Sequence, residues 1–285
     1  MANGPLVRYS NVERCAVLAL DHAPVNSLSL GLRRDLAAAL TRAAFDDQAQ
    51  AIVLIGAGNG FCAGGDLKEF GTPEATARPG VSADLHPAIE RSTKPVIAAI
   101  HDIAMGGGLE TALACHLRVA SASARIGLPE VLRGTIPLSG TQRLPRLLSL
   151  EQSLDLIVSG RTATAAEFVG TPLFDRVIED ANVLDAALAL ASECVVSGVL
   201  VPLVRERAIA HENAAACFSA ARLQVRDAAA DNVVPLRAID AIEAAVICDD
   251  FDEGLAQARQ IYETLMRSES VTRLRDRFFA ERDTG

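Results

Sequence analysis

One stretch, residues 94–110, limits the possible folds more than any other part of the sequence. It reads KPVIAAIHDIAMGGGLE. Five apolar residues in a row, Val96–Ile100, are typical of a strand that is buried on both faces of a sheet. Three glycines follow, and Leu109, Leu113 and Leu117 then recur at helical spacing. We therefore expect a helix that begins at the glycines.

The expected strand–glycine–helix turn allows two interpretations. A helix N-terminus presents N–H groups without intrahelical partners beside the positive end of the helix dipole, which suits an anion. Glycines also let a ligand approach the backbone closely. Glu110 would then lie in the first helical turn, next to the bound group. Alternatively, the stretch is an ordinary tight turn in which the helix dipole favours the Glu110 carboxylate.

Length, charge and cysteine spacing narrow the class of protein. The 285 residues are enough for one large domain, or for one domain with an appendage. A net charge of −9 argues against a nucleic-acid surface, and no apolar run approaches the roughly 18 residues of a membrane span. The six cysteines lack paired spacing, so we expect buried thiols in a reducing compartment, with no disulfide framework and no metal site. The chain ends match neither a signal peptide nor a peroxisomal signal, so we predict a cytoplasmic protein.

Apolar periodicity along the chain predicts an α/β protein whose strand-rich part ends near residue 180. We expect strands at 15–21, 51–55, 96–100, 118–121, 124–127 and 173–178. We expect helices at 30–44, 84–91, 149–158, 163–169, 183–196 and 251–265, and a short helix from Leu67 that Asp66 caps. Residues 71–83 are rich in Gly, Pro, Thr and Ala, and we expect them to form a mobile loop. Beyond Pro202 the pattern predicts helices and short linkers.

A glycine-rich segment after the second expected strand, GAGNGF at 56–61, is similar to a dinucleotide-binding fingerprint. Phe61 replaces the final glycine, however, and the acidic residue expected about 20 positions later is missing. We therefore reject a dinucleotide site at this segment.

Two more stretches carry chemically informative residues. Residues 61–70 read FCAGGDLKEF, in which small residues again allow close approach to the backbone. Residues 128–144 read LPEVLRGTIPLSGTQRL. Glu130 follows a proline and precedes two apolar residues, which is an unusual place for a carboxylate. Taken alone, Glu130 is either a functional carboxylate or a glutamate favoured in the first turn of a helix.

These three stretches, in this order, resemble the motifs of the crotonase (enoyl-CoA hydratase/isomerase) superfamily. The resemblance runs from about residue 10 to about residue 200. It implies an α/β, crotonase-like fold of stacked ββα turns with a helical C-terminal portion. We expect residues 1–200 to form the crotonase core with the active site, and residues 201–285 to form a helical C-terminal extension.

The resemblance also implies a role for each candidate residue. Gly65 and Gly107 would supply the two N–H groups of an oxyanion hole. Glu110 and Glu130 match the paired glutamates of hydratases, with Glu110 as the base for water and Glu130 as the proton donor. The expected CoA-binding residues are Ala63, through its backbone at the adenine, Asp66, and Lys68, at the phosphates.

The implied reaction is the reversible addition of water across the 2,3-double bond of a 2-enoyl-CoA. CoA enters only as part of this acyl-CoA substrate, and no cofactor or metal is implied. Family hydratases usually carry a glycine-rich run that helps to hold the water. Here residues 137–141 read PLSGT, one residue short and with Leu138 in place of glycine. A Δ3,Δ2-enoyl-CoA isomerase therefore stays open as an alternative, and a non-catalytic protein that kept the fold is a third.

The C-terminal segments add a finer resemblance. Residues 241–246, 251–255 and 278–282 are similar to the segment that joins the hydratase and 3-hydroxyacyl-CoA dehydrogenase halves of bifunctional β-oxidation enzymes. Single-function members of the superfamily typically form trimers or pairs of trimers. We therefore expect a homo-oligomer, either a trimer or a hexamer, or a monomer if the tail folds back over the core.

Overall fold

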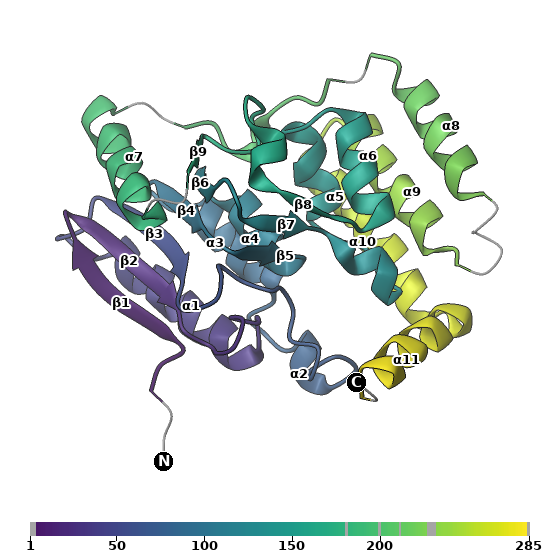
Figure 1. The fold of residues 1–285 in the computed structure, drawn as a ribbon, viewed down its shortest axis with the longest axis horizontal. Helices are drawn as coiled ribbons and strands as arrows, with labels where there is room; N and C mark the ends of the chain where they lie inside the picture. The colour runs from purple at the N-terminus through teal and green to yellow at the C-terminus, as the bar shows by residue number, and fades with distance from the viewer. Residues whose placement is uncertain (1–3, 180–181, 199–200, 211, 227–231, 284–285) are drawn as a thin grey trace. The chain divides into compact units, whose positions relative to one another are not determined.

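The computed structural model describes residues 4–179, 182–198, 201–210, 212–226 and 232–283 (Figure 1). The expected cytoplasmic location rests partly on the two chain ends. Of these, residues 1–3 and 284–285 lie outside the described residues. The chain divides into two compact units: residues 1–126 with 163–204, and residues 127–162 with 205–285. The predicted division into domains at residues 200/201 stays a prediction.

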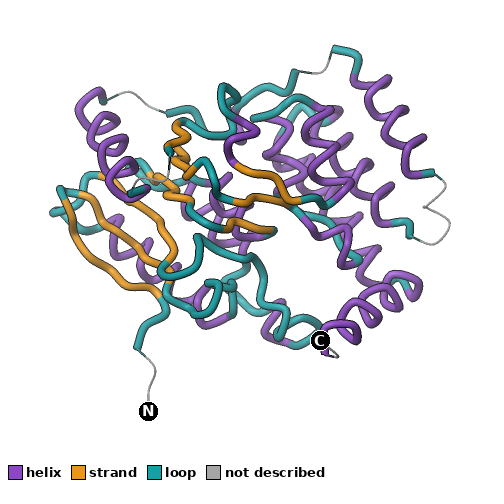
Figure 2. Tube along the Cα trace, in the orientation of Figure 1, coloured by secondary structure: helices purple, strands orange, loops and turns teal. Residues whose placement is uncertain are grey.

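Among the described residues, a six-stranded sheet forms the centre of the first unit (Figures 1 and 2). Its strand order is β1-β2-β3-β4-β6-β9, in which β1 is antiparallel to β2 and the other neighbours are parallel. The strands are β1 Val7–Val12, β2 Cys15–Leu20, β3 Ala51–Gly56, β4 Val96–Ile100, β6 Leu117–Ser121 and β9 Arg176–Ile178. All five residues of β4 are buried, as predicted for a central strand with both faces covered.

Helices cover the sheet because alternate side chains of each strand face opposite sides. One face, which includes Val17, Val53 and Ile97, packs against Ala187 and Ala191 of α7 (Val183–Ser197). Helix α1 (Leu30–Ala44) packs against β1 and β2 and buries Leu32, Leu36 and Leu40. Its first residue follows Ser29, whose hydroxyl accepts the N–H of Leu32 as an N-cap.

The remaining elements of the first unit are a smaller sheet and several helices. The smaller sheet has the order β5-β7-β8, with β5 Ile103–Met105, β7 Arg125–Gly127 and β8 Thr162–Thr164. Helix α4 spans Gly107–Ala114 and begins directly after β5. The short helices are α2 Pro73–Thr76, a π-helix at Val81–Leu85, α3 His86–Glu90 and a 3-10 helix at Ala165–Phe168.

The second unit is helical in its described part. Its α-helices are α5 Gly140–Arg143, α6 Leu150–Ser159, α8 Ala214–Val225, α9 Val234–Ile247, α10 Phe251–Arg267 and α11 Glu269–Asp283. Short 3-10 helices lie at Pro129–Arg133, Leu144–Arg146 and Val204–Glu206, the last of which crosses the boundary of the unit. Helix α9 is the common neighbour of α5, α6, α8 and α10. The Ala241 carbonyl of α9 accepts the side-chain N–H of Gln142 at 2.8 Å, which ties α9 to α5.

The predicted fold class, α/β and crotonase-like with a helical C-terminal portion, is confirmed, but three local predictions are wrong. Residues 67–71 form turns rather than a helix, because Gly71 adopts a positive φ and Thr72, which precedes a proline, is extended. Residues 163–169 form the end of β8 and a 3-10 helix. The helix that begins at the glycines ends at Ala114, and Leu117 starts β6, which pairs with β4.

Two expectations based on composition also need correction. Residues 71–83 were expected to form a loop, and they contain α2 and most of the π-helix. Only three of the six cysteines are buried, whereas Cys194, Cys217 and Cys248 are partly exposed. Across the described residues, every helix is too short or too polar to cross a membrane.

Candidate functional site

The two glycine segments lie side by side in the first unit because Cys62 pairs with β5. Cys62 forms a parallel bridge with Ala104, its N–H donates to the Ile103 carbonyl at 3.1 Å, and its carbonyl accepts the Met105 N–H at 2.9 Å. These hydrogen bonds align residues 62–65 with residues 103–107. Segments that are 40 residues apart in the sequence therefore meet at the start of α4.

Backbone crowding explains why glycines occupy this contact. Gly64 has a φ of +91°, and a Cβ at Gly64 would lie 2.6 Å from the Met105 carbonyl oxygen and 3.1 Å from the Gly107 nitrogen. A Cβ at Gly108 would lie 2.2 Å from the Cys62 carbonyl oxygen. Side chains at these positions would push the two segments apart.

The N–H groups of Gly65 and Gly107 are neighbours at this contact. The Gly65 nitrogen lies 3.6 Å from the position that a Gly107 Cβ would occupy. Gly65 is exposed and Gly107 is partly exposed, so a ligand can reach both. Within the described part of the chain, neither N–H donates to an acceptor in a loop, turn or side chain. Gly107 is the first residue of α4, where backbone N–H groups lack intrahelical partners and the helix dipole favours negative charge.

Glu110 lies in the first turn of α4, three residues after Gly107. Residues three apart on a helix share a face, so Glu110 belongs to the same side of α4 as Gly107. The residue is 7% exposed, and its backbone N–H donates to the Gly106 carbonyl at 2.9 Å. The structure therefore brings together Gly65, Gly107 and Glu110 on neighbouring segments of the first unit.

A buried polar pair supports the first turn of α4. The Thr111 hydroxyl donates to the Gly107 carbonyl at 2.7 Å, and His86 Nε2 lies 3.3 Å from that hydroxyl oxygen. Both side chains are fully buried. Sequence reasoning missed both residues, because a single His and a single Thr carry no pattern that links them.

The segment before α1 also holds the first glycine segment, and it too was missed. The Leu28 N–H donates to the Gly64 carbonyl at 2.8 Å, and Leu28 forms a parallel bridge with Gly65. The buried Asn26 side chain donates to the carbonyls of Ala57 and Gly60, each at 2.9 Å. The available signal was an asparagine, a residue that tolerates a positive φ, between a strand and a helix.

Cys62, in the middle of the first glycine segment, is a structural thiol. Its Sγ donates to the Asn26 carbonyl at 3.0 Å. Burial raises the pKa of the Cys62 thiol to about 12, so it stays protonated and is a poor nucleophile at neutral pH.

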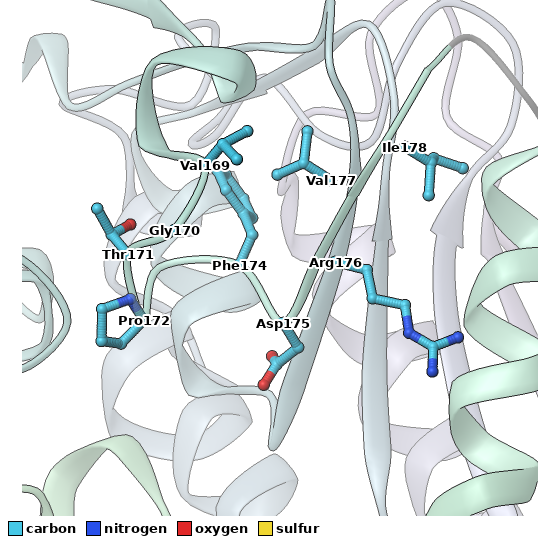
Figure 3. Close-up of a pocket in the computed structure, with 9 residues that line it drawn as sticks. All are labelled: Val169, Gly170, Thr171, Pro172, Phe174, Asp175, Arg176, Val177 and Ile178. Carbon is cyan, nitrogen blue, oxygen red and sulfur yellow. The ribbon is translucent and has the colours of Figure 1, made fainter.

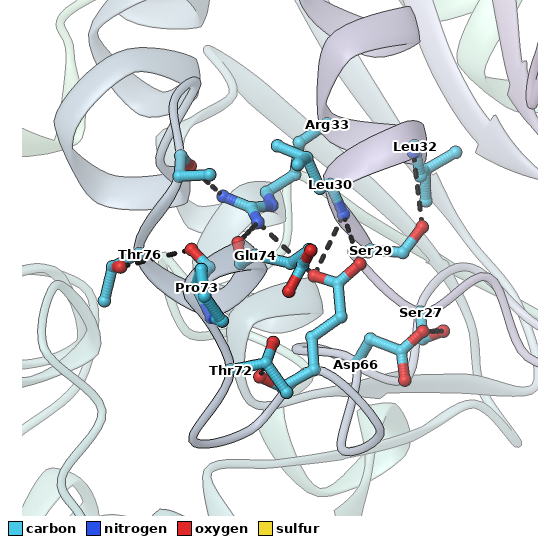
Figure 4. Close-up of polar contacts among 12 residues, drawn as sticks. Ser27, Ser29, Leu30, Leu32, Arg33, Asp66, Thr72, Pro73, Glu74 and Thr76 are labelled. Carbon is cyan, nitrogen blue, oxygen red and sulfur yellow. Dashed lines mark hydrogen bonds and ion pairs between the residues drawn. The ribbon is translucent and has the colours of Figure 1, made fainter.

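The three expected CoA-binding residues, Ala63, Asp66 and Lys68, come shortly after Cys62 in the chain. The Ala63 N–H donates to the Val25 carbonyl at 3.0 Å. Both Asp66 carboxylate oxygens accept protein donors. Oδ2 accepts the Ser27 hydroxyl at 3.2 Å (Figure 4), and Oδ1 accepts the Lys68 N–H at 2.9 Å. Asp66 therefore shapes the turn that carries Lys68, whose side chain is exposed. The CoA contacts of these residues stay predictions.

Lys94, the second of the two lysines, stabilises the end of α1. Its Nζ donates to the carbonyls of Ala43 at 2.7 Å and Asp46 at 2.8 Å. A cation at a helix C-terminus satisfies terminal carbonyls and complements the helix dipole.

Glu130 belongs to the second unit. It is the second residue of the 3-10 helix Pro129–Arg133, it is partly exposed, and its carbonyl accepts the Thr135 N–H at 3.1 Å. Gly134 ends this helix in the left-handed conformation. The pairing of Glu130 with Glu110 stays a prediction.

A surface hollow of about 570 Å³ lies elsewhere in the first unit, along β9 (Figure 3). It is lined by residues 169–172 and 174–178 and contains none of the candidate residues. Its charged groups have partners, because Asp175 accepts the Arg118 N–H at 2.8 Å and Arg176 pairs with Glu193. A ligand site usually presents polar groups that converge on the ligand, which this hollow lacks. No group of three or more His, Cys, Asp or Glu side chains suited to a metal ion occurs among the described residues.

The chain is similar to proteins of one family along most of its length. Residues 12–232 match the profile of the family described as Enoyl-CoA hydratase/isomerase. The chain is 36% identical over 284 residues to a peroxisomal bifunctional enzyme of Danio rerio, covering 97% of this chain and 38% of that protein. It is 39% identical over 184 residues to a probable enoyl-CoA hydratase of Bacillus subtilis, covering 62% of this chain and 71% of that protein.

Solved structures share the fold. The carnitinyl-CoA hydratase from Mycobacterium avium matches with a TM-score of 0.70 at 25% identity, covering 98% of this chain and 97% of that chain. The chain belongs to the enoyl-CoA hydratase/isomerase family, as the ordered motifs predicted. It spans 38% of the length of the Danio rerio bifunctional relative.

Proposed function

We propose that the protein is an enoyl-CoA hydratase that adds water reversibly across the 2,3-double bond of a 2-enoyl-CoA. The observation that carries this proposal is the meeting of the Gly65 and Gly107 N–H groups at the start of α4. Two converging backbone donors suit a thioester carbonyl that gains negative charge during the reaction.

In the proposed reaction, water attacks C3 while a proton reaches C2. The thioester carbonyl takes up the developing enolate charge at the Gly65 and Gly107 N–H groups. Glu110 removes a proton from the attacking water, and Glu130 delivers a proton to C2. Each step is a proton transfer or an addition, so the reaction needs no redox cofactor and no metal. CoA takes part only as the carrier of the acyl group, with Ala63, Asp66 and Lys68 as its proposed contacts.

Relatives extend the proposal to a pathway. One relative, from Oryza sativa, is named a peroxisomal fatty acid beta-oxidation multifunctional protein. We place the proposed hydration in fatty-acid or related acyl-CoA degradation on this basis. A cytoplasmic location and a homo-oligomer, or a monomer with a folded-back tail, stay predictions from the sequence.

A Δ3,Δ2-enoyl-CoA isomerase is the second candidate, and one observation favours it. In residues 137–141 the carbonyls of Pro137 and Leu138 accept the N–H and the hydroxyl of Thr141, at 3.0 and 3.1 Å. The Ser139 carbonyl accepts the Gln142 N–H at 3.2 Å. Because this run hydrogen-bonds internally, its carbonyls are less available to hold a water. An isomerase needs only one carboxylate to move a proton and no bound water.

Two substrates separate the candidates. Crotonyl-CoA loses its conjugated enoyl absorbance when it is hydrated, and a 3-enoyl-CoA gains that absorbance when it is isomerised. We expect loss of absorbance with crotonyl-CoA. Isomerisation without hydration would support the second candidate, and inactivity towards both substrates would contradict the enzyme proposal.

A further inference from the structure

Arg33 of α1 carries a buried guanidinium that the proposed chemistry does not use. The residue is 3% exposed. Its Nη2 donates to the Glu74 carbonyl at 2.5 Å (Figure 4). Its Nη1 donates to the carbonyls of Ala77 at 2.7 Å and Pro79 at 2.8 Å. Three carbonyls of one connecting segment therefore converge on a single side chain.

A second contact ties the same segment to α1. The Glu69 carboxylate accepts the Leu30 N–H at 2.8 and 3.0 Å, and its Oε2 lies 3.4 Å from Arg33 Nη2. Leu30 is the first residue of α1, where an N–H has no intrahelical partner. Glu69 thus caps the helix and pairs with Arg33.

The start of α1 also contacts the glycine segment, since Leu28 bonds to Gly64 and forms a bridge with Gly65. Residues 28–33 therefore hold both the Gly65 donor and the segment from Glu69 to Pro79. Lys68 lies between the two points of attachment.

We infer that Arg33 is a positioning residue that holds residues 69–79 as a fixed wall beside Gly65 and so sets the place of Lys68. That this wall binds the acyl-CoA rests on the proposed function. Arginine suits this task because its planar guanidinium offers five donors in a fixed geometry, whereas lysine is a point charge. A wall that is ordered before the substrate arrives loses less conformational entropy on binding. Arg33 therefore acts on substrate binding more than on turnover.

Proteolysis of the full chain tests the inference without relying on activity. Endoproteinase Glu-C cleaves after glutamate, and the carbonyl of the Glu74–Ala75 bond is one of the three that Arg33 binds. We expect Arg33→Gln to be cut at this bond at least about tenfold faster than wild type, and Arg33→Lys to be intermediate. Arg34→Gln is the matched control, because Arg34 is the next residue on α1 and is exposed. Cleavage after Glu90, which is buried in α3, reports global unfolding and should not change.

Kinetics with a 2-enoyl-CoA supply the second measurement. We expect Arg33→Gln to raise KM about tenfold while kcat changes less than about threefold. Faster cleavage at Glu74 with no turnover in any variant would uphold the wall and reject the proposed function. Wild-type cleavage in an active Arg33→Gln protein would overturn the inference and leave the proposed function intact. If Arg33→Gln does not fold, Arg33→Lys, which keeps the charge and most of the volume, decides by the same comparison.

Discussion

At Gly107 the proposed oxyanion hole needs a backbone N–H, and there is little space for a side chain. A Cβ there would lie 3.3 Å from Leu28 Cδ1 and 3.6 Å from the Gly65 nitrogen, contacts that a flexible leucine can relieve. Two substitutions therefore distinguish the effect of losing the N–H from the effect of adding side-chain volume. Alanine keeps the N–H, whereas proline removes it, at a first helical position where proline is otherwise tolerated.

We predict that Gly107→Pro folds and loses a factor of about 10²–10³ in kcat, the usual effect of one missing oxyanion donor. Gly107→Ala should lose much less. Circular dichroism and thermal unfolding establish that both variants fold before rates are compared. A folded proline variant with wild-type kcat would remove Gly107 from the proposed oxyanion hole.

At Lys68 the prediction concerns binding alone. Its exposed side chain extends from the turn that Asp66 shapes, so a phosphate contact would be the same in the ground state and the transition state. Lys68→Ala should raise KM for an enoyl-CoA and leave kcat nearly unchanged, and added salt should shrink the difference. Lys68→Arg, which keeps the charge, is the control. An unchanged KM in Lys68→Ala at low salt would make Lys68 an ordinary surface residue.

Among the elements, β1 and the end of α1 are joined by a polar cluster around Asp46. The Tyr9 hydroxyl donates to Asp46 Oδ2 at 2.6 Å, Asn11 Nδ2 donates to the same oxygen at 2.9 Å, and the Arg42 guanidinium lies 3.7 Å from the centre of the Tyr9 ring. Burial, followed by the hydrogen bond to Asp46 and its charge, raises the pKa of Tyr9 to about 12. Hydrogen bonds from Tyr9, Asn11 and Gln48 lower the pKa of Asp46 to about 2.

The directions of these two pKa shifts determine how the contribution of the Asp46 cluster to stability depends on pH. The folded pKa of Tyr9 lies above its ordinary value of 10.0, so its contribution to stability is complete below pH 10 and is lost as the pH rises towards 12. The folded pKa of Asp46 lies below its ordinary value of 3.8, so its contribution is present above that pH and is lost as the pH falls towards 2.

Phenolate absorbance measures the alkaline shift directly. The chain has two tyrosines, so Tyr262→Phe leaves Tyr9 as the only one. At pH 10, where an ordinary tyrosine is half ionised, we expect almost no phenolate while circular dichroism remains native. Adding Asp46→Asn should increase the phenolate fraction, although not to the half expected of an ordinary tyrosine, because burial, the largest cause of the raised Tyr9 pKa, remains. Equal ionisation in the two folded proteins would show that Asp46 does not hold the Tyr9 proton.

Over the whole molecule, apolar periodicity predicted the elements that form the core. Helix α1 and strand β4 have the predicted bounds, because Leu32, Leu36 and the run Val96–Ile100 are buried by the pattern that revealed them. The ordered motifs lie in local sequence, and they identified the family. The resemblance to that family in turn implied the meeting of Gly65 and Gly107.

Contacts between polar residues that are distant in the sequence could not be predicted from apolar periodicity or local motifs. Arg33 was indistinguishable from its exposed neighbour Arg34 until the connecting segment was seen to fold over it. Asn26 and Thr111 likewise act on backbone groups brought near by the fold. Turns after Asp66 replaced the predicted helix because a positive φ at Gly71 and a proline two residues later outweighed a capping signal.

The central claim is that Glu110 and Glu130 act as an acid–base pair, and the most direct measurement is the hydration rate of crotonyl-CoA by Glu110→Gln and Glu130→Gln. The exposed Glu13→Gln is the matched control. We predict that both variants fold, bind the enoyl-CoA and hydrate it at least about a hundredfold more slowly, while Glu13→Gln keeps the wild-type rate. Loss of hydration in Glu110→Gln with intact isomerisation of a 3-enoyl-CoA would identify the isomerase instead. Wild-type hydration by both folded variants would contradict the account.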